Sequence, residues 1–228
     1  MNKKNRAPAK IRQIDWSLCF IADSQASGGR DVLWLIEEAV AGGATIVQLR
    51  GKTWTVRNFL RLAVQAVELV RPKGIPLIIN DRADIALACR ADGVHLGQDD
   101  LPVSEARKIL GQDRLIGISI NTPEEARRAE EASADYAGAG PVFATLSKPD
   151  LQPLLGLEGL RRIRTETRLP ILAIGGITLA NVGEVMAAGA DGVAVISAIA
   201  SAASPRQAST KFIETIGKVR KNPAPQIA

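Results

Sequence analysis

Short apolar runs alternate with longer amphipathic segments along most of the chain. The short runs are rich in Ile, Val and Leu and lack polar alternation, which is typical of strands buried on both faces. We predict eight such strands, at Leu18–Ile21, Thr45–Leu49, Pro76–Ile79, Gly93–Leu96, Leu115–Ile118, Tyr136–Gly138, Ile171–Ile174 and Gly192–Val195.

The segments between these runs place their apolar residues with a helical period. Thr122-Pro123-Glu124-Glu125 has the composition of a helix start, with an N-cap, a proline at the first helical position and acids in the first turn. Thr178 is the expected cap of the helix after the seventh strand. The predicted helices are Val32–Ala41, Val56–Val70, Arg82–Cys89, Val103–Leu110, Pro123–Glu131, Leu157–Arg164, Leu179–Ala187 and Arg206–Val219.

Alternation of strands and helices predicts a parallel sheet with helical crossovers. Eight such units in a chain of 228 residues fit a single α/β domain with the TIM (β/α)₈ barrel fold, and an open doubly wound sheet is the alternative. We expect the barrel to cover residues 14–220, between a basic, disordered N-terminal tail at 1–13 and a flexible C-terminal tail at 221–228. Glycine-containing turns at 41–44, 90–93 and 188–192 each connect a helix to the next strand. We expect them to lie at the amino-terminal end of the barrel and to have a structural role.

Charge and cysteine content narrow the functional classes. The net charge is +5, and the first 12 residues carry five Lys or Arg and no acid, so the rest of the chain is formally neutral. We expect no nucleic-acid partner, because no basic surface with interleaved aromatics is visible. No apolar run is long enough for a membrane span. Cys19 and Cys89 are expected to be buried and reduced, which suits the cytoplasm, and a homo-oligomer is left open.

Charged residues follow several strands, at the end where barrels of this kind carry their active sites. Arg50, Lys52 and Lys148 supply positive charge, and Asp81 and Asp100 supply two carboxylates. This combination predicts a diphosphate bridged by Mg²⁺, since that ion binds one or two carboxylates together with phosphate oxygens. The alternative is that the same charges only pair with one another on a solvated rim.

Two further sequence features point to phosphate. Gly175-Gly176 follows the seventh strand and Ile196-Ser197 follows the eighth, where barrels commonly bind phosphate. The only histidine, His95, lies within a strand and is expected to be structural. No Cys-His or Ser-His-Asp arrangement is available, so we expect electrostatic catalysis of the departure of diphosphate rather than nucleophilic chemistry.

The strand-end motifs resemble those of the thiamine phosphate synthase family over about residues 15–217. They occur in the family's order as Gln48-x-Arg50-x-Lys52, Asn80-Asp81-Arg82, Gly93-Val94-His95-Leu96-Gly97-Gln98-x-Asp100, Gly117-x-Ser119, Gly140-Pro141-x-Phe143-x-Thr145-x-Ser147-Lys148, Ala173-Ile174-Gly175-Gly176-Ile177 and 189–197. The resemblance implies that hydroxymethylpyrimidine diphosphate and a thiazole phosphate are joined to give thiamine phosphate and pyrophosphate, by a dissociative substitution with Mg²⁺ as cofactor.

The resemblance also implies a role for individual residues. Asp81 and Asp100 correspond to the metal ligands. The family's residues that bind the pyrimidine diphosphate correspond to Gln48, Arg50, Lys52, Asn80, Ser119 and Lys148. Four of them are the catalytic candidates: Arg50, Lys52, Ser119 and Lys148. Residues for the thiazole phosphate correspond to Thr145, Ser147, Gly176, Ile196 and Ser197.

Departures from the family pattern leave two alternatives. Asn121 stands where the family often has histidine, and Ser147 stands where it often has threonine. A related tautomerase of a thiazole phosphate carboxylate would need an acid or base poised near neutral pH, and only His95 is available for that. A non-catalytic protein that binds phosphorylated metabolites is the other alternative.

Overall fold

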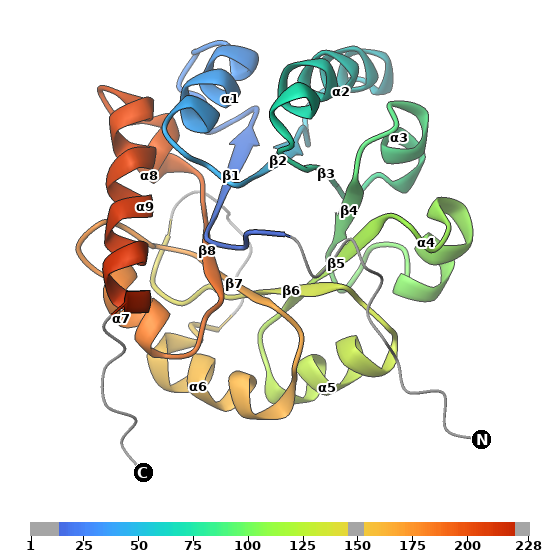
Figure 1. Cartoon of the computed structure of the whole chain (residues 1–228). Helices are drawn as coiled ribbons and strands as arrows, with labels where there is room; N and C mark the ends of the chain where they lie inside the picture. The colour runs from blue at the N-terminus through green and yellow to red at the C-terminus, as the bar shows by residue number, and fades with distance from the viewer. Residues whose placement is uncertain (1–13, 146–152, 222–228) are drawn as a thin grey trace.

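The computed structural model describes residues 14–145 and 153–221. Eight parallel strands follow one another around a closed barrel, and β8 pairs with β1 (Figure 1). The predicted barrel is therefore confirmed, and the open sheet is wrong. The strands are β1 (Leu18–Asp23), β2 (Ile46–Arg50), β3 (Leu77–Asn80), β4 (Gly93–Leu96), β5 (Leu115–Ile120), β6 (Tyr136–Ala139), β7 (Ile171–Ile174) and β8 (Gly192–Val195).

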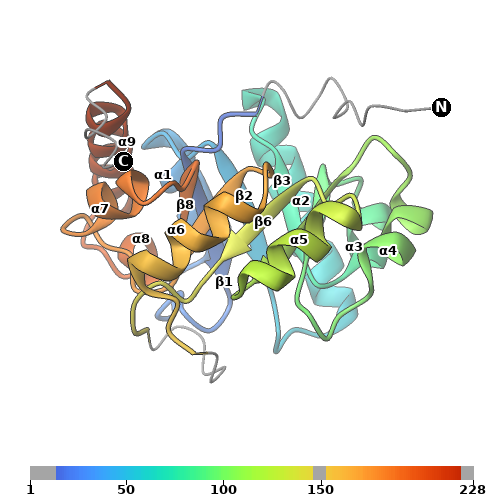
Figure 2. The same ribbon diagram turned by 90° about the horizontal axis from the view of Figure 1, so that it is seen from below.

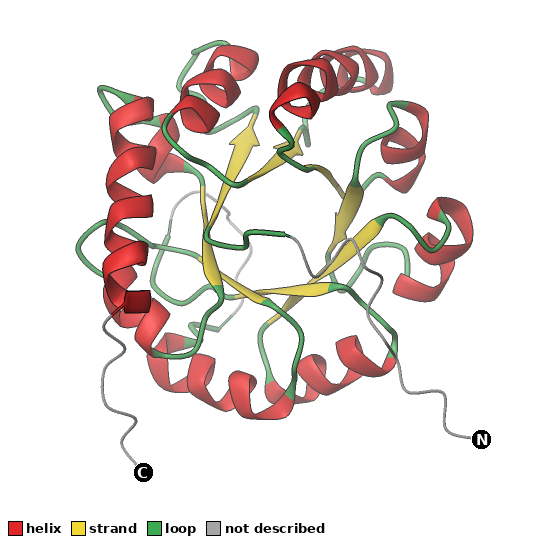
Figure 3. Ribbon diagram, in the orientation of Figure 1, coloured by secondary structure: helices red, strands yellow, loops and turns green. Residues whose placement is uncertain are grey.

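Helices surround the barrel on its outside (Figure 3). Thr122 caps α5 as predicted, and its side chain and that of Glu125 form a capping box. The helices are α1 (Val32–Ala41), α2 (Val56–Val70), η2 (Arg71–Lys73), α3 (Ala83–Ala88), α4 (Val103–Leu110), α5 (Pro123–Glu131), α6 (Gly156–Glu166), α7 (Val182–Ala187), α8 (Ser197–Ala200) and α9 (Pro205–Lys221).

The start of α7 differs from the prediction. The helix begins at Val182, and Asn181 rather than Thr178 is its N-cap residue. The backbone N–H of Thr178 donates to Oδ1 of Asn181 at 2.8 Å, so the side chain of Asn181 holds residues 178–181 in a turn before the helix begins. The four-residue helix α8 was also absent from the predicted helices, because a single turn has no measurable period.

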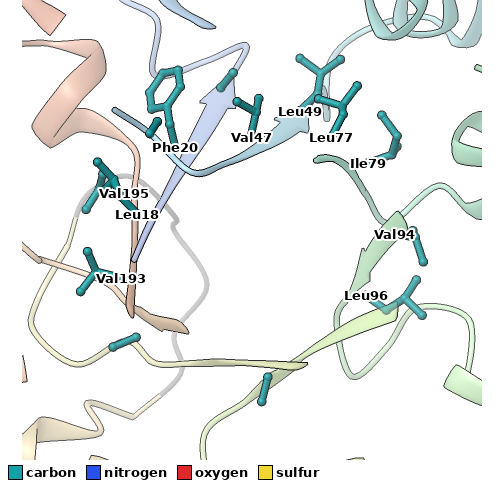
Figure 4. Packing of buried hydrophobic residues seen from close by; sticks show 14 of the residues in the cluster. Leu18, Phe20, Val47, Leu49, Leu77, Ile79, Val94, Leu96, Val193 and Val195 are labelled. Carbon is teal, nitrogen blue, oxygen red and sulfur yellow. The ribbon is translucent and has the colours of Figure 1, made fainter. Parts of the chain in front are cut away.

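Buried side chains form two apolar layers on opposite faces of the barrel wall. One layer points outward and packs against the helices, and Figure 4 shows its members on β1 to β4 and β8, such as Phe20, Leu49 and Val193. The other lines the barrel interior and includes Cys19, Ile78 and Leu172. Strands buried on both faces are the reason that the sequence shows continuous apolar runs rather than alternation.

The segment that leads into β1 covers the amino-terminal opening of the barrel. It crosses that opening in Figure 1, and Figure 2 shows it on one side of the molecule. The ring of Trp16 lies 5.0 Å from that of Tyr136 inside the barrel. Gly192 allows this approach, since a Cβ there would lie 1.7 Å from the carbonyl oxygen of Trp16.

Three aspartates link neighbouring strands at this same end. Each precedes a strand, and its Oδ2 accepts the backbone N–H at or next to the start of the strand before it: Asp92 with Leu77 at 3.0 Å, Asp135 with Ile116 at 2.7 Å and Asp191 with Ile171 at 2.8 Å. The predicted structural role of the turns around 90–93 and 188–192 agrees with these contacts.

The predictions on the cysteines and on membrane spans can be compared with the described residues, whereas most of the two predicted tails cannot. Cys19 and Cys89 are both free and buried, as predicted, and burial raises the pKa of the Cys19 thiol to about 12. Across residues 14–145 and 153–221, none of the helices has the length and apolar character needed to cross a bilayer. The predicted C-terminal tail begins one residue too early, because Lys221 is the last residue of α9. Residues 1–13 and 222–228 of the two predicted tails lie outside the described ranges.

Candidate active site

The site is built where the strands end and the loops toward the helices begin. Because side chains alternate along a strand, Gln48 and Arg50 of β2 face the barrel interior together, as do Ile21 and Asp23 of β1. The register places Ile21 beside Gln48 and Asp23 beside Arg50. Charged side chains are therefore added to the interior only in the last layer, at the carboxyl ends of the strands.

Two predicted metal ligands meet at the ends of β3 and β4. The carboxyl groups of Asp81 and Asp100 lie close together, near enough for each to influence the charge of the other. Lys52 pairs with one of the two: its Nζ lies 2.6 Å from Oδ2 of Asp81, and its side chain is half exposed. The backbone N–H of Gly97 donates to Oδ2 of Asp100 at 2.6 Å and orients that carboxyl.

Local structure holds Asp81 in an unusual conformation. Its φ is 63°, in the left-handed region, which Asp adopts more readily than most residues. Its backbone N–H donates to the carbonyl of His95 at 2.7 Å, so the end of β4 fixes the turn after β3. Burial raises the pKa of Asp81; Lys52 opposes this effect and Asp100 adds to it. A carboxyl in this state gains from a nearby cation.

The two carboxyl groups fit a divalent cation as a partial ligand set. Among the described residues, no group of three or more His, Cys, Asp or Glu side chains could enclose a metal ion. Asp81 and Asp100 therefore offer two carboxyl groups and leave other positions of an ion to other ligands. Mg²⁺ characteristically accepts such a set when phosphate oxygens and water complete its six positions.

A hydrogen-bonded row of polar side chains forms the floor of the site. His95 contacts the hydroxyl of Tyr136 through Nδ1 at 3.1 Å and Oγ of Ser119 through Nε2 at 3.0 Å. Gln48 lines the same small cavity as His95, Ser119 and Tyr136. Burial raises the pKa of the Tyr136 hydroxyl well above its usual value, so that group stays protonated. His95 is thus a hydrogen-bonded, buried histidine, as expected.

Glycines on neighbouring strands make room for this row. A Cβ on Gly117 would lie 2.1 Å from the ring of Tyr136, and one on Gly138 would lie 2.9 Å from the ring of His95. The cavity that these polar side chains line has a volume of about 20 Å³, room for roughly one water molecule. This cavity is too small for a phosphorylated metabolite, so a substrate would bind above this floor, at the mouth of the barrel.

Arg50 lies at the mouth in a buried ion pair. Its Nη1 donates to Oδ2 of Asp23, and the two side chains are 7% and 1% exposed. Asn80 is also buried, on the neighbouring strand. The residues predicted for the pyrimidine diphosphate thus lie on the interior face of three strands, toward their carboxyl ends: Gln48 and Arg50 on β2, Asn80 on β3 and Ser119 on β5.

The predicted phosphate residues lie on the loops after β7 and β8. Gly175 and Gly176 have φ of 97° and 62°. A Cβ on Gly176 would lie 2.6 Å from the carbonyl oxygen of Ala144, so these glycines also let the loop after β6 pack on the loop after β7. Ile196 and Ser197 form the start of α8, next to the end of β8. Thr145 is the last described residue before the gap, and Ser147 and Lys148 lie outside the described residues.

Comparison with known proteins decides the family. The family model described as thiamine monophosphate synthase matches residues 18–199. The chain belongs to this family. Thiamine-phosphate synthase of Chloroflexus aurantiacus is 49% identical over 189 residues, covering 83% of this chain and 87% of that protein. The enzyme of the same name from Moorella thermoacetica is 47% identical over 90% of this chain and 98% of its own length.

Solved structures agree with this assignment. Thiamine phosphate pyrophosphorylase from Pyrococcus furiosus superposes with a TM-score of 0.83 at 37% identity, over 90% of this chain and 98% of that one. A 3-hexulose-6-phosphate synthase superposes with a TM-score of 0.68 at 19% identity, which shows the shared fold alone.

From the sequence, Asp23 and Tyr136 received no place in the site, and Asn121 was noted only as a departure from the family pattern. Asp23 lies two residues beyond the predicted end of the first strand, and a single acid at a strand end is a weak signal. Tyr136 meets His95 only because β4 and β6 both face the interior. Asn121 donates through Nδ2 to the carbonyls of Gly140 and Pro153 at 3.1 and 3.0 Å, so it ties the loop after β6 to the barrel.

Proposed function

We propose that this protein is a thiamine-phosphate synthase. It joins hydroxymethylpyrimidine diphosphate and a thiazole phosphate to give thiamine phosphate and pyrophosphate. The observation that carries the proposal is the meeting of Asp81 and Asp100 beside Lys52, at the mouth that also contains Arg50, in a chain of this family. This meeting supports a site for a metal-bound diphosphate.

The chemistry we propose needs no acid or base. The bond between the pyrimidine methylene carbon and the diphosphate oxygen breaks, and its electron pair leaves with the oxygen. The thiazole nitrogen then attacks the resulting cation and forms the new C–N bond. Because no proton moves in either step, a floor without a poised histidine fits the reaction. The protein's task is to bind the substrates and to stabilise charge on the leaving group.

Each residue has a defined part in this proposal. Asp81 and Asp100 would hold Mg²⁺, which supplies positive charge to the diphosphate when bound. Lys52, which pairs with Asp81, and Arg50, at the end of the neighbouring strand β2, are assigned to the same leaving group. Lys148 is assigned to it from the sequence. The pyrimidine contacts are assigned to Gln48, Asn80 and Ser119. The thiazole phosphate is assigned to Thr145, Ser147, Gly176, Ile196 and Ser197.

The contacts of His95 weigh against a tautomerase. A general acid or base near neutral pH must reach the substrate, whereas both ring nitrogens of His95 are engaged, with Tyr136 and with Ser119. We also assign the protein to the cytoplasm, since its two cysteines are free.

The test uses the purified full-length chain with both phosphorylated substrates and MgCl₂. Thiamine phosphate and pyrophosphate should form in equal amounts, and omission of either substrate or addition of excess EDTA should abolish both. Asp99→Asn serves as a control for the loss of a carboxylate outside the metal site. It removes an exposed charge next to Asp100 and should leave the rate unchanged. A folded wild-type protein that binds substrates without forming product would instead support the non-catalytic alternative.

A further inference from the structure

Asp23 is a buried carboxylate that the proposed chemistry does not use. It is 2% exposed at the end of β1, beside the buried Arg50 at the end of β2. We propose that Asp23 is a positioning residue, which holds the guanidinium of Arg50 in the orientation that receives the diphosphate. This inference rests on the proposed function and adds a residue to it.

The carboxyl of Asp23 is itself fixed before it meets Arg50. Its Oδ1 accepts the backbone N–H groups of Gln25 and Ala26 at 2.7 and 3.1 Å, so the turn after β1 holds the group in one rotamer. Its Oδ2 then accepts from Nη1 of Arg50. One oxygen is therefore anchored to backbone and the other is directed at the guanidinium, which is the arrangement of a group that orients another.

Arginine gains from such an anchor. Its long side chain has many rotamers to lose when it is fixed, and it carries five N–H donors in a rigid plane. A contact that uses Nη1 fixes the plane and leaves further donors for phosphate oxygens, which arginine binds through two parallel hydrogen bonds. Stability alone is a weak reason for the pair, since a buried ion pair is often replaceable by apolar residues without loss.

The negative charge of Asp23 gives the proposal a distinctive sign. A carboxylate close to a diphosphate repels it, so a purely electrostatic view predicts that neutralising Asp23 tightens diphosphate binding. If Asp23 positions Arg50, neutralising it weakens binding, because the amide group of an asparagine would present a donor to the guanidinium and release it. The direction of the change therefore separates the two effects.

The experiment compares Asp23→Asn with Asp31→Asn. Asparagine at position 23 keeps an oxygen for the N–H groups of Gln25 and Ala26. Asp31 is an exposed acid after the same strand, where it caps α1 through Trp34. Asparagine caps helices equally well, so Asp31→Asn removes the same charge without loss of structure. Binding of inorganic pyrophosphate in the presence of MgCl₂ is measured by calorimetry for the wild-type chain and each variant.

We expect Asp23→Asn to raise the Kd of pyrophosphate and the KM of the pyrimidine diphosphate about tenfold, and to leave the KM of the thiazole phosphate unchanged. Asp31→Asn should change none of them. In an Arg50→Gln background, Asp23→Asn should have little further effect on the Kd, because the group that it positions is gone. NMR of the arginine side chains should show slow rotation of the Arg50 guanidinium in the wild-type chain and averaged signals in Asp23→Asn.

The outcomes separate the two proposals. No pyrophosphate binding and no product from the wild-type chain would reject the proposed function, and with it the use assigned to Asp23. Binding by the wild-type chain that is equal or tighter in Asp23→Asn would reject the positioning role alone. An Arg50 guanidinium that rotates freely in the wild-type chain would reject it as well.

Discussion

Aspartate has a different set of partners at the two ends of this barrel. At the amino-terminal end, Asp92, Asp135 and Asp191 each accept a backbone N–H next to the start of the preceding strand. Two of the three also pair with an arginine of a neighbouring helix, Asp135 with Arg107 and Asp191 with Arg164. All partners of these carboxylates belong to the chain itself, so the contacts need no bound ligand.

At the carboxyl-terminal end the carboxylates face one another and the cations of the mouth. Asp81 lies close to Asp100 and pairs with Lys52, and Asp23 faces Arg50. Two carboxyls this close repel when both are charged, and a bound cation relieves that repulsion. From this comparison we infer that the same residue type stabilises the fold at one end and serves a ligand at the other, a division that the variants below test.

The largest effect is expected for Asp81→Asn. Loss of one metal-binding oxygen should lower kcat/KM on the order of 10³-fold, which corresponds to several kcal/mol of lost charge stabilisation. Asparagine tolerates the left-handed backbone of position 81 nearly as well as aspartate, so the fold is not strained. Steady-state rates against MgCl₂ concentration should show the loss, together with a weaker dependence on the metal.

Stability provides the contrast for the same variant. Removal of a charge that repels Asp100 should leave the free energy of unfolding unchanged or raise it, as measured by urea denaturation. A variant that is destabilised by more than about 2 kcal/mol would show that Asp81 belongs with the structural aspartates, and a variant with full activity would exclude it as a metal ligand.

Asp135→Ala is expected to behave in the opposite way. Oδ2 of Asp135 accepts from the backbone N–H of Ile116 and from Nη2 of Arg107, each at 2.7 Å. Truncation leaves both donors without this acceptor, which should lower the free energy of unfolding by about 3 kcal/mol. For a chain of this size that corresponds to a decrease in Tm of roughly 6–12 °C. The kcat below the transition should stay within twofold, and a large loss of kcat at unchanged Tm would refute the division.

Most of the fold follows from local patterns. Helices α1, α2, α4 and α5 and strands β4, β7 and β8 begin and end where the sequence predicts. Each has either a helical period or a buried run with a clear turn on both sides. The start of α7 was misplaced because threonine and asparagine are both good caps, and the side-chain contact of Asn181 that decides between them is not visible in the pattern.

The site was predictable where a residue's place at a strand end is enough, and not where a contact crosses the barrel. The meeting of Asp81 with Asp100 follows from two neighbouring strands ending at one rim. The contact of Tyr136 with His95 depends on two strands that are not adjacent and on Gly117, which leaves space for the ring. Asp23 was missed because β1 continues through Ala22 into a charged residue, where the apolar pattern stops.

Asn121→Ala is expected to have a moderate effect at the carboxyl-terminal end. Its Nδ2 donates to the carbonyls of Gly140 and Pro153, which border the loop that contains the predicted Thr145. Loss of two neutral hydrogen bonds, each contributing about 1 kcal/mol, should loosen this loop and raise the KM of the thiazole phosphate about threefold to tenfold. The KM of the pyrimidine diphosphate serves as the internal control. Equal increases in both KM values would show a general disturbance of the mouth instead.

Asp92→Asn should have the smallest effect. Oδ2 of Asp92 accepts the backbone N–H of Leu77 at 3.0 Å, and in the described part of the chain no cation is paired with it. The oxygen of an asparagine can accept the same N–H, so only the charge assistance of one hydrogen bond is lost, about 1 kcal/mol or less in the free energy of unfolding. A matched Asp191→Asn variant, which also loses its ion pair with Arg164, should be destabilised more. If Asp92→Asn is the more destabilised of the two, the backbone contact rather than the arginine partner sets the contribution of each aspartate at this end.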